Sequence, residues 1–340
     1  DVAGADLTGN LAELQRLIEK HLGVKGKSAI LDIKNNAIDL DEMESLSTFD
    51  GIPEEKEPKK GTAQSRKKEK KRAKRATEVP PVLHWADQAA RRILKRSADN
   101  PNHSDTITCA SGITPSGVVH IGNFREIITV ELVVRALRDA ASKGTNVRFI
   151  YSWDDYDVFR KVPKDMPKPE ELKKYLRQPI VDVPDPYDDE ESYARHNEIQ
   201  VEKAMPVLGI YPEYIYQAKM YRDCRYADGM KTALEHATEI KDILDKYRKE
   251  PLPDDYLPIR IFCEKCNRDT VENIHYEGEY NVTYTCDCKH SDTFDMRKKG
   301  IAKLQWRVDW PMRWDYEGVD FEPAGKDHFS AGGSRESGVE

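Results

Sequence analysis

A loop rich in glycine and proline, PSGVVHIGN at 115–123, joins two apolar segments and strongly constrains how this chain can fold. Residues 105–113 before the loop have the pattern of a strand, and residues 118–139 after it have that of a helix apolar on more than one stripe. A second strand is predicted within 146–157. Strand, loop, helix and strand form a βαβ unit, so we predict an α/β fold with a doubly wound parallel sheet.

The same loop has the residues of a phosphate-binding site. Ligands of doubly wound sheets lie beyond the carboxyl ends of the strands, where free amide groups and the helix dipole attract anions. Gly117 and Gly122 let a phosphate or a flat base approach the backbone, and His120 and Asn123 are donors on the first helical turn. The alternative interpretation is structural: glycine and proline make a tight turn, and His120 caps the helix.

Composition and charge limit the class of protein. The mean hydropathy is -0.75 and no apolar run is long enough to cross a bilayer, so we expect no membrane partner and a cytoplasmic location. The net charge of -7 is uneven, because residues 56–75 contain eleven Lys or Arg and two Glu. This basic arm is predicted to be a solvated linker, to bind RNA phosphates, or to do both.

Four of the six cysteines lie close together in the sequence and suggest a metal site. CEKC provides Cys263 and Cys266, and CDCKH begins twenty residues after Cys266 with Cys286 and Cys288. Two such pairs of thiolates are typical of a zinc ribbon or knuckle, in which four closed ligands make the metal structural. His290 is an alternative to one member of the second pair, and a chance group of buried cysteines is the competing interpretation.

Six blocks of sequence together resemble one family. They are HWAD from His84, SGITPSGVVHIGNFRE from Ser111, WDDYDVFRKVP from Trp153, VPDP from Val183, RVDWPMRW from Arg307 and GVDFEPAGKDH from Gly318. The HIGN tetrapeptide resembles the HIGH signature of class I aminoacyl-tRNA synthetases. The ordered set, spread over 82–338, is similar to the class I lysyl-tRNA synthetases found mostly in archaea. This resemblance implies a Rossmann-like nucleotide-binding domain of the HUP type.

The resemblance also implies an activity and its site. A lysine–tRNA ligase activates lysine with ATP and Mg²⁺ and transfers it to tRNA-Lys, with a structural Zn²⁺ in the connecting insertion. The ATP-binding residues that it implies are Pro115, Gly117, His120, Gly122, Asn123, Gly325 and Asp327, with His120 and Asn123 catalytic. The lysine-binding residues are Gly112, Thr114, Asp154, Asp155, Trp306 and His328.

Some of these residues also have a structural interpretation. The adjacent carboxylates Asp154 and Asp155 follow a predicted strand, so they are either partners of a lysine ammonium group or caps of neighbouring backbone. Trp310 and Trp314 are expected to pack in the core, because their four-residue spacing is that of a helix face.

The expected domain order follows the resemblance and has one departure from it. A small α+β accessory domain at 1–52 and a basic linker at 53–80 precede the first half of the catalytic domain at 81–165, an insertion at 166–300 and the start of the second half at 301–340. The family's KMSKS loop and anticodon-binding domain do not occur within 1–340, so we expect doubtful activity from this chain alone. The alternative function is a non-catalytic relative that binds lysine, an adenylate or RNA.

Overall fold

A computed structural model describes residues 84–101, 103–164, 166–329 and 333–340. The chain divides into two compact units, Asp1–Gln88 and Ala89–Glu340, and nearly all described residues belong to the second. The predicted accessory domain, the basic linker and its basic arm lie outside the described residues. Of the helices within the described ranges, none combines the length and apolar character needed to cross a bilayer.

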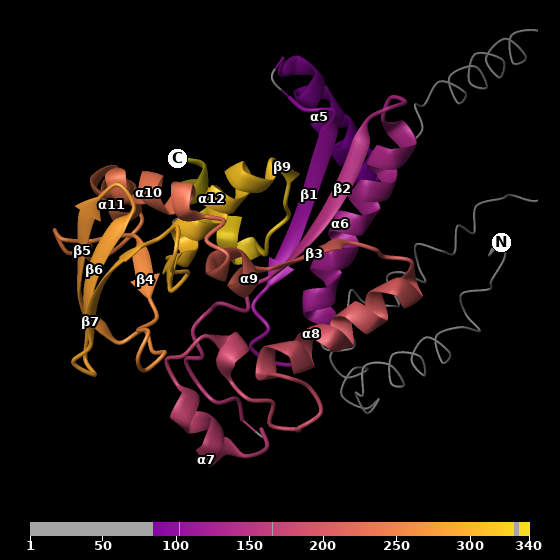
Figure 1. The fold of residues 1–340 in the computed structure, drawn as a ribbon. Helices are drawn as coiled ribbons and strands as arrows, with labels where there is room; N and C mark the ends of the chain where they lie inside the picture. Colours follow the sequence, from indigo (N-terminus) through magenta and orange to yellow (C-terminus); the bar gives the residue numbers. More distant parts are fainter. Residues whose placement is uncertain (1–83, 102, 165, 330–332) are drawn as a thin grey trace, which may run out of the picture. The chain divides into compact units, whose positions relative to one another are not determined.

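A four-stranded parallel sheet carries the loop at 115–123 (Figure 1). Its order is β3-β2-β1-β9, and the strands are β1 at Thr106–Ile113, β2 at Asn146–Trp153, β3 at Glu213–Tyr216 and β9 at Val319–Phe321. β1 lies between two neighbours and is buried over 107–111, which explains its run of small and apolar residues. Because every pair is parallel, the four carboxyl ends meet at one edge of the sheet.

The helices next to this sheet confirm the α/β prediction. α5 at Trp85–Asp99 precedes β1, and α6 at Ile121–Ala140 connects β1 to β2 and packs against both strands. α12 at Trp306–Glu317 leads into β9 and contacts it. A 3-10 turn at Lys326–Phe329 and α13 at Ser334–Val339 follow β9.

The segment between β2 and α12 forms further helices and two antiparallel sheets. The helices are α7 at Pro169–Leu172, α8 at Tyr193–Ala204, α9 at Gln217–Arg222, α10 at Ala227–Glu235 and α11 at Ala237–Asp245, with 3-10 turns at Lys173–Tyr175, Ile180–Asp182 and Met205–Leu208. β4 at Ile259–Ile261 pairs with β8 at Ala302–Leu304. β5 at Val271–Gly278, β6 at Asn281–Cys286 and β7 at Ser291–Asp295 form a sheet of their own, away from β1 and β2 in Figure 1.

The structure differs from the sequence predictions at the start of α6 and in the strand β3. α6 begins at Ile121 rather than near residue 118, because His120 adopts an extended backbone (φ -100°, ψ 171°) and is the N-cap. β3 lies within 166–300, the range expected to form an insertion, yet it pairs with β2 in the parallel sheet. It has four residues, of which only Ile215 is buried, and so gives almost no strand pattern.

The approach of Gly300 to α9 generates a stability prediction. A Cβ atom at Gly300 would lie 2.3 Å from both Arg222 Cα and the Tyr221 carbonyl oxygen, and Tyr156 donates a hydrogen bond of 2.7 Å to the Gly300 carbonyl. We expect Gly300→Ala to lower the free energy of unfolding by about 1–3 kcal/mol, because backbone must move to admit the methyl group. Denaturant unfolding measures the change.

The matched control is Gly325→Ala. A Cβ atom there meets nothing closer than 3.8 Å, at the His328 ring. Equal midpoints for Gly300→Ala and the unchanged chain would contradict the close approach.

Candidate functional site

His120 caps α6 at the carboxyl edge of the parallel sheet. Its Nδ1 accepts a hydrogen bond from the Gly122 amide at 3.1 Å, and Asn123 Oδ1 accepts one from the His120 amide at 3.4 Å. The two side chains therefore satisfy backbone donors reciprocally, as in a capping box. Because Nδ1 is an acceptor, the neutral ring carries its proton on Nε2. The exposed ring thus presents an N–H donor at a helix N-terminus, where anions are favoured.

Gly122 makes room for this arrangement. A Cβ atom on Gly122 would lie 2.9 Å from His120 Cε1 and 3.0 Å from its Nδ1. From the sequence, Gly122 was expected to allow close approach of a ligand; in the structure it also leaves space for the His120 ring. Any larger residue at 122 would displace the imidazole from the helix end.

The loop before His120 is held by α8. Tyr193 donates a hydrogen bond of 2.7 Å from its hydroxyl to the Ser116 carbonyl, and Asn197 Nδ2 donates one of 3.3 Å to the Pro115 carbonyl. Both side chains are almost fully buried. These two residues were not predicted from the sequence, because the pattern of a helix does not indicate which distant loop the polar residues of that helix contact. Gly117 lies in the same loop, with no atom closer to a Cβ position than the Tyr193 hydroxyl at 4.0 Å.

Thr114 is linked through Asp157 to a buried lysine. Thr114 Oγ1 donates to Asp157 Oδ2 at 2.9 Å, and Lys303 Nζ pairs with Asp157 Oδ1 at 2.7 Å. The Lys303 side chain is only 5% exposed. Burial tends to raise the pKa of Asp157, but the charge and hydrogen bond of Lys303, with the bond from Thr114, lower it below its usual range. Asp157 is therefore a carboxylate at neutral pH.

Asp154 belongs to the same polar cluster. Arg313 of α12 contacts Asp154 Oδ1 at 2.7 Å and Asp309 Oδ2 at 3.4 Å, and Tyr221 hydrogen-bonds to Asp309. The three carboxylates of the cluster therefore face two cations, Lys303 and Arg313. Burial raises the pKa of Asp154, with the charge of Arg313 opposing the rise, and the Asp154 side chain is 26% exposed.

Asp155 points away from this cluster. Its Oδ1 accepts a hydrogen bond of 2.7 Å from the Ala218 amide at the start of α9, and the residue is 3% exposed. The chain turns directly after Asp154, where the Asp157 amide donates to the Asp154 carbonyl, so the structure separates two carboxylates that are adjacent in the sequence. Its geometry matches the alternative interpretation, a cap of neighbouring backbone.

Trp306 and His328 come together near the end of the described chain. Their ring centroids are 6.4 Å apart, His328 Nδ1 lies 2.6 Å from Ser334 Oγ, and the Trp306 residue is 46% exposed. Gly325 and Asp327 lie in the segment that follows β9, three residues and one residue before His328. Gly112, in β1, is in close contact with β2: a Cβ atom would lie 2.7 Å from the Ser152 carbonyl oxygen.

Trp310 and Trp314 have more than a packing role. Both indole N–H groups donate to Glu322 Oε2 just after β9, and the Trp310 bond is 2.8 Å. Glu126, on the second turn of α6, accepts a hydrogen bond of 3.3 Å from Ser111. Burial, with the negative charge of Glu322, raises the pKa of Glu126 to about 7. Two acidic side chains missed by the sequence argument thus flank the sheet edge.

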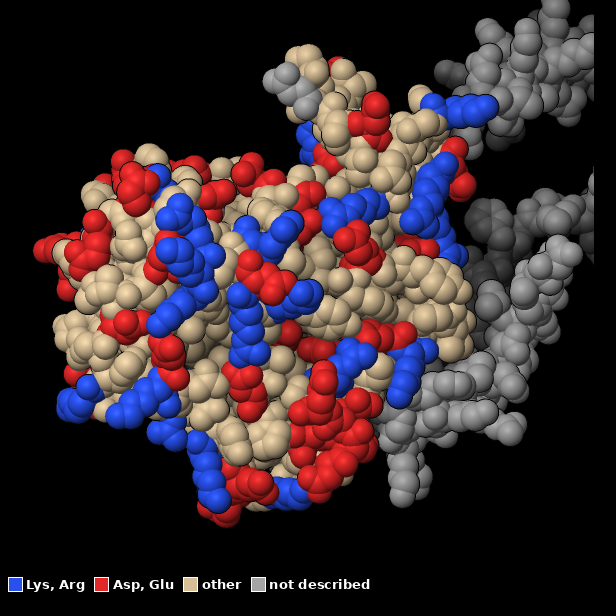
Figure 2. Space-filling model, viewed as in Figure 1, with Lys and Arg blue, Asp and Glu red and all other residues tan. Residues whose placement is uncertain are grey.

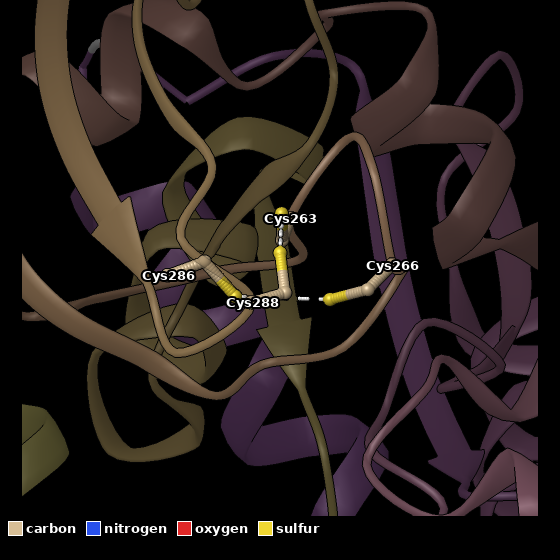
Figure 3. A group of neighbouring side chains, drawn as sticks. All are labelled: Cys263, Cys266, Cys286 and Cys288. Atoms are coloured by element: carbon tan, nitrogen blue, oxygen red, sulfur yellow. Dashed lines mark hydrogen bonds between the residues drawn. The ribbon is translucent and has the colours of Figure 1, made fainter.

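The four predicted cysteine ligands meet in one group (Figure 3). All four Sγ atoms lie within 4.8 Å of one another, and the Cys263–Cys288 and Cys266–Cys286 Sγ separations are both 3.7 Å. A tetrahedral zinc with Zn–S bonds of about 2.3 Å has ligand edges of about 3.8 Å, so this spacing fits zinc. The first pair follows β4 and the second ends β6, with Cys288 two residues further on.

The geometry bears on the choice between Cys288 and His290. Within the described residues, the group of possible metal ligands contains Cys288 and not His290. The His290 ring instead packs edge-on against Tyr284, at 6.0 Å between centroids.

Comparison with known proteins identifies the family. The family described as tRNA synthetases class I (K) matches residues 83–340, which is more than half of the chain. The chain belongs to this family.

Several curated relatives of this synthetase chain are lysine–tRNA ligases. The one from Borreliella burgdorferi is 55% identical over 253 residues, and the one from Treponema pallidum is 52% identical over 254 residues; each alignment covers 74% of this chain and 47% of the relative. The archaeal relative from Pyrococcus horikoshii is 44% identical over 263 residues, covering 76% and 48%. The chain thus spans about half the length of the curated relatives that it matches.

Metal content tests the cysteine group of this synthetase chain. We expect about one zinc per chain by elemental analysis, and Cys286→Ser to lose the metal and lower the melting temperature, because a missing thiolate opens a structural site. Cys224→Ser is the control, since Cys224 is a free cysteine outside the group. Purified chain that is fully folded and metal-free would refute the assignment.

Proposed function

We propose that the protein of which this chain is part is a lysine–tRNA ligase. The observation that carries the proposal is the His120 cap at the sheet edge, with a cluster of three carboxylates and two cations after β2, in a member of the class I (K) synthetases. The first feature suits the phosphates of ATP and the second suits a basic amino acid. The lysine–tRNA ligases among the relatives support the same reaction.

The ATP site in this proposal is built on the loop 115–123. The free amides of the first turn of α6, the His120 Nε2–H group and the Asn123 amide group are donors for the phosphates. Pro115, Gly117 and Gly122 shape the loop, and Gly325 with Asp327 holds the adenosine at the end of the neighbouring strand β9. Mg²⁺ enters as the complex with ATP.

The lysine site in this proposal lies beside Thr114. An ammonium group of lysine adds a third cation to this cluster of three carboxylates, in which Lys303 pairs with Asp157 and Arg313 with Asp154 and Asp309. Trp306 and His328 pack along the aliphatic stem, and Gly112 keeps β1 close to β2. Asp155 is removed from this site, because its side chain turns to the Ala218 amide.

The chemistry in this proposal needs positioning and charge stabilisation. An oxygen of the lysine carboxylate bonds to the α-phosphorus of ATP, and pyrophosphate leaves with the electrons of the broken bond. The carboxylate is already ionised at neutral pH, so no side chain has to activate it. A ribose hydroxyl of tRNA-Lys then attacks the lysyl carbonyl, and AMP leaves. Donors around the phosphates supply the main rate effect.

Metal, tRNA and cellular location complete the proposal. Zinc bound by Cys263, Cys266, Cys286 and Cys288 keeps the β5–β7 sheet folded, and that sheet contacts the tRNA acceptor end. The basic arm 56–75 adds contacts to RNA phosphates, which a flatter salt dependence of tRNA binding after its deletion would show. We place the reaction in the cytoplasm, where tRNA, lysine and ATP meet.

Lysine affinity tests the proposed amino-acid site. We expect Asp157→Asn to weaken lysine binding about tenfold, because the amide keeps the size of the side chain and removes its charge. Thr114→Val should weaken it as well, by releasing Asp157 from its hydrogen bond. Isothermal titration with lysine and with a non-hydrolysable lysyl-adenylate measures both. Asp188→Asn, on an exposed loop, is the control, and unchanged affinity in Asp157→Asn would remove the carboxylate from the site.

Lysine-dependent ATP–pyrophosphate exchange tests the role of His120. In the complete protein we expect His120→Ala to slow exchange about 100- to 1,000-fold, the usual loss for one donor aimed at developing charge. Lysine affinity should stay the same, because His120 does not contact the carboxylate cluster. An exchange rate equal to that of the unchanged enzyme would limit His120 to a capping role.

A further inference from the structure

A cavity of about 520 Å³ is lined by Asp155 and by none of the carboxylates or cations of the cluster at the sheet edge. It lies between the end of β2, the first two turns of α8 and the start of α9. Polar side chains line one part of it: Asp155, Ser192, Arg195 and Glu198. The alkyl chain of a ligand can contact three further lining residues, Val181, Tyr216 and Ala218. None of the steps proposed above uses this cavity.

The cations that line the cavity already have carboxylate partners. Arg195 makes two hydrogen bonds to Glu202, at 2.8 and 2.9 Å. Arg222 contacts both oxygens of Asp182, at 2.6 and 2.7 Å, and Lys219 pairs with Asp223 at 2.5 Å. Their charges are therefore largely compensated by groups other than the two buried acids.

The two buried acids, Asp155 and Glu198, have much weaker support. Glu198 is 3% exposed, its Oε2 atom receives one long contact of 3.4 Å from Arg195, and its Oε1 atom has no hydrogen-bond partner among the described residues. Asp155 accepts from the Ala218 amide and is also 3% exposed. A buried carboxyl oxygen without a donor costs about 1–3 kcal/mol, so this end of the cavity favours a ligand that donates.

The raised pKa values of Asp155 and Glu198 also favour a ligand that donates hydrogen bonds or carries positive charge. Burial raises the pKa of Asp155 to about 7, with the Ala218 bond opposing the rise and Asp154 adding to it. Burial, then the charge of Asp155, raises the pKa of Glu198 to about 8, with Arg195 opposing. The charged groups that act on this pair from the surrounding elements are Asp154, Arg195, Glu202 and Lys303. At neutral pH the two carboxyl groups therefore retain a proton unless a cation is bound beside them.

An acidic segment adjoins the cavity. Residues 188–191 (DDEE) precede α8, and Glu191 lines the cavity. Figure 2 shows acidic side chains gathered over the segment that leads into α8. A cluster of one sign beside a cavity raises the local concentration of the opposite charge.

We propose that this cavity binds a primary ammonium group on an alkyl chain, at a site separate from the proposed lysine site. The ammonium N–H groups donate to Glu198 and Asp155, and the alkyl chain lies against Val181, Ala218 and Tyr216. A bare metal ion suits the cavity less well, because no group of three possible metal ligands in the described residues includes Asp155 or Glu198. No covalent bond changes: the ammonium group replaces a carboxyl proton, which goes to solvent.

Titration calorimetry with 1,5-diaminopentane on the full chain tests the proposal. We expect measurable binding that strengthens from about pH 6 to about pH 8, because the diamine stays protonated while the acid pair loses its proton. Repeating the titration in buffers of different ionisation enthalpy should show proton release at the lower pH. No binding, or an affinity that falls as the pH rises, would overturn the proposal.

Two variants separate this cavity from the proposed lysine site. Glu198→Gln should weaken diamine binding at least about tenfold and leave lysine binding unchanged, and Glu171→Gln, on the exposed face of α7, should alter neither. Thr114→Val should weaken lysine binding only. If Thr114→Val weakened diamine binding and Glu198→Gln did not, the diamine would be occupying the lysine site and the second site would be refuted.

A folding control keeps these results interpretable. Equal zinc content and equal melting temperature below about pH 6 would show that Glu198→Gln folds as the unchanged chain does, because Glu198 is neutral there. If that variant were unfolded, Glu198→Asp would take its place: it keeps the charge, withdraws the carboxylate, and should weaken the diamine while sparing lysine.

Discussion

The carboxyl edge of the sheet depends on two desolvated cations. Lys303 and Arg313 reach it from β8 and α12, and each pairs with an aspartate in the segment after β2. Removing one partner of a buried ion pair leaves the other uncompensated, which commonly costs 3–5 kcal/mol. The parallel sheet and the segment that holds the cysteine group are therefore fixed to each other by charge as well as by apolar contact.

The fold could be predicted from the sequence where the hydrophobic pattern was long, and the loop at 115–123 could be predicted where glycine and proline restrict the backbone. The apolar crossover helix and its two strands indicated a parallel sheet, and the spacing of the cysteines indicated a group of four. β3 could not be predicted, because a four-residue edge strand with one buried residue has no period to detect. Asp157, Tyr193 and Asn197 were missed for another reason: their partners lie 43, 77 and 82 residues away along the chain.

The pair Asp154 and Asp155 shows what sequence adjacency leaves open. The chain turns after β2, so Asp154 pairs with Arg313 while Asp155 accepts a hydrogen bond from the Ala218 amide of α9. A single dipeptide thus contributes to two separate polar environments: Asp154 to the cluster with Arg313, and Asp155 to the cavity that Glu198 of α8 also lines. Which aspartate belongs to which environment depends on tertiary packing.

The attachment of the loop at 115–116 to Tyr193 and Asn197 has a consequence for the order of folding. The βαβ unit is assembled from contacts near in sequence, whereas these two tethers form only after α8 has docked from far along the chain. Loop closure over such separations is slow compared with local helix formation. The final geometry of the loop 115–123 therefore arises late, after the rest of the parallel sheet has formed.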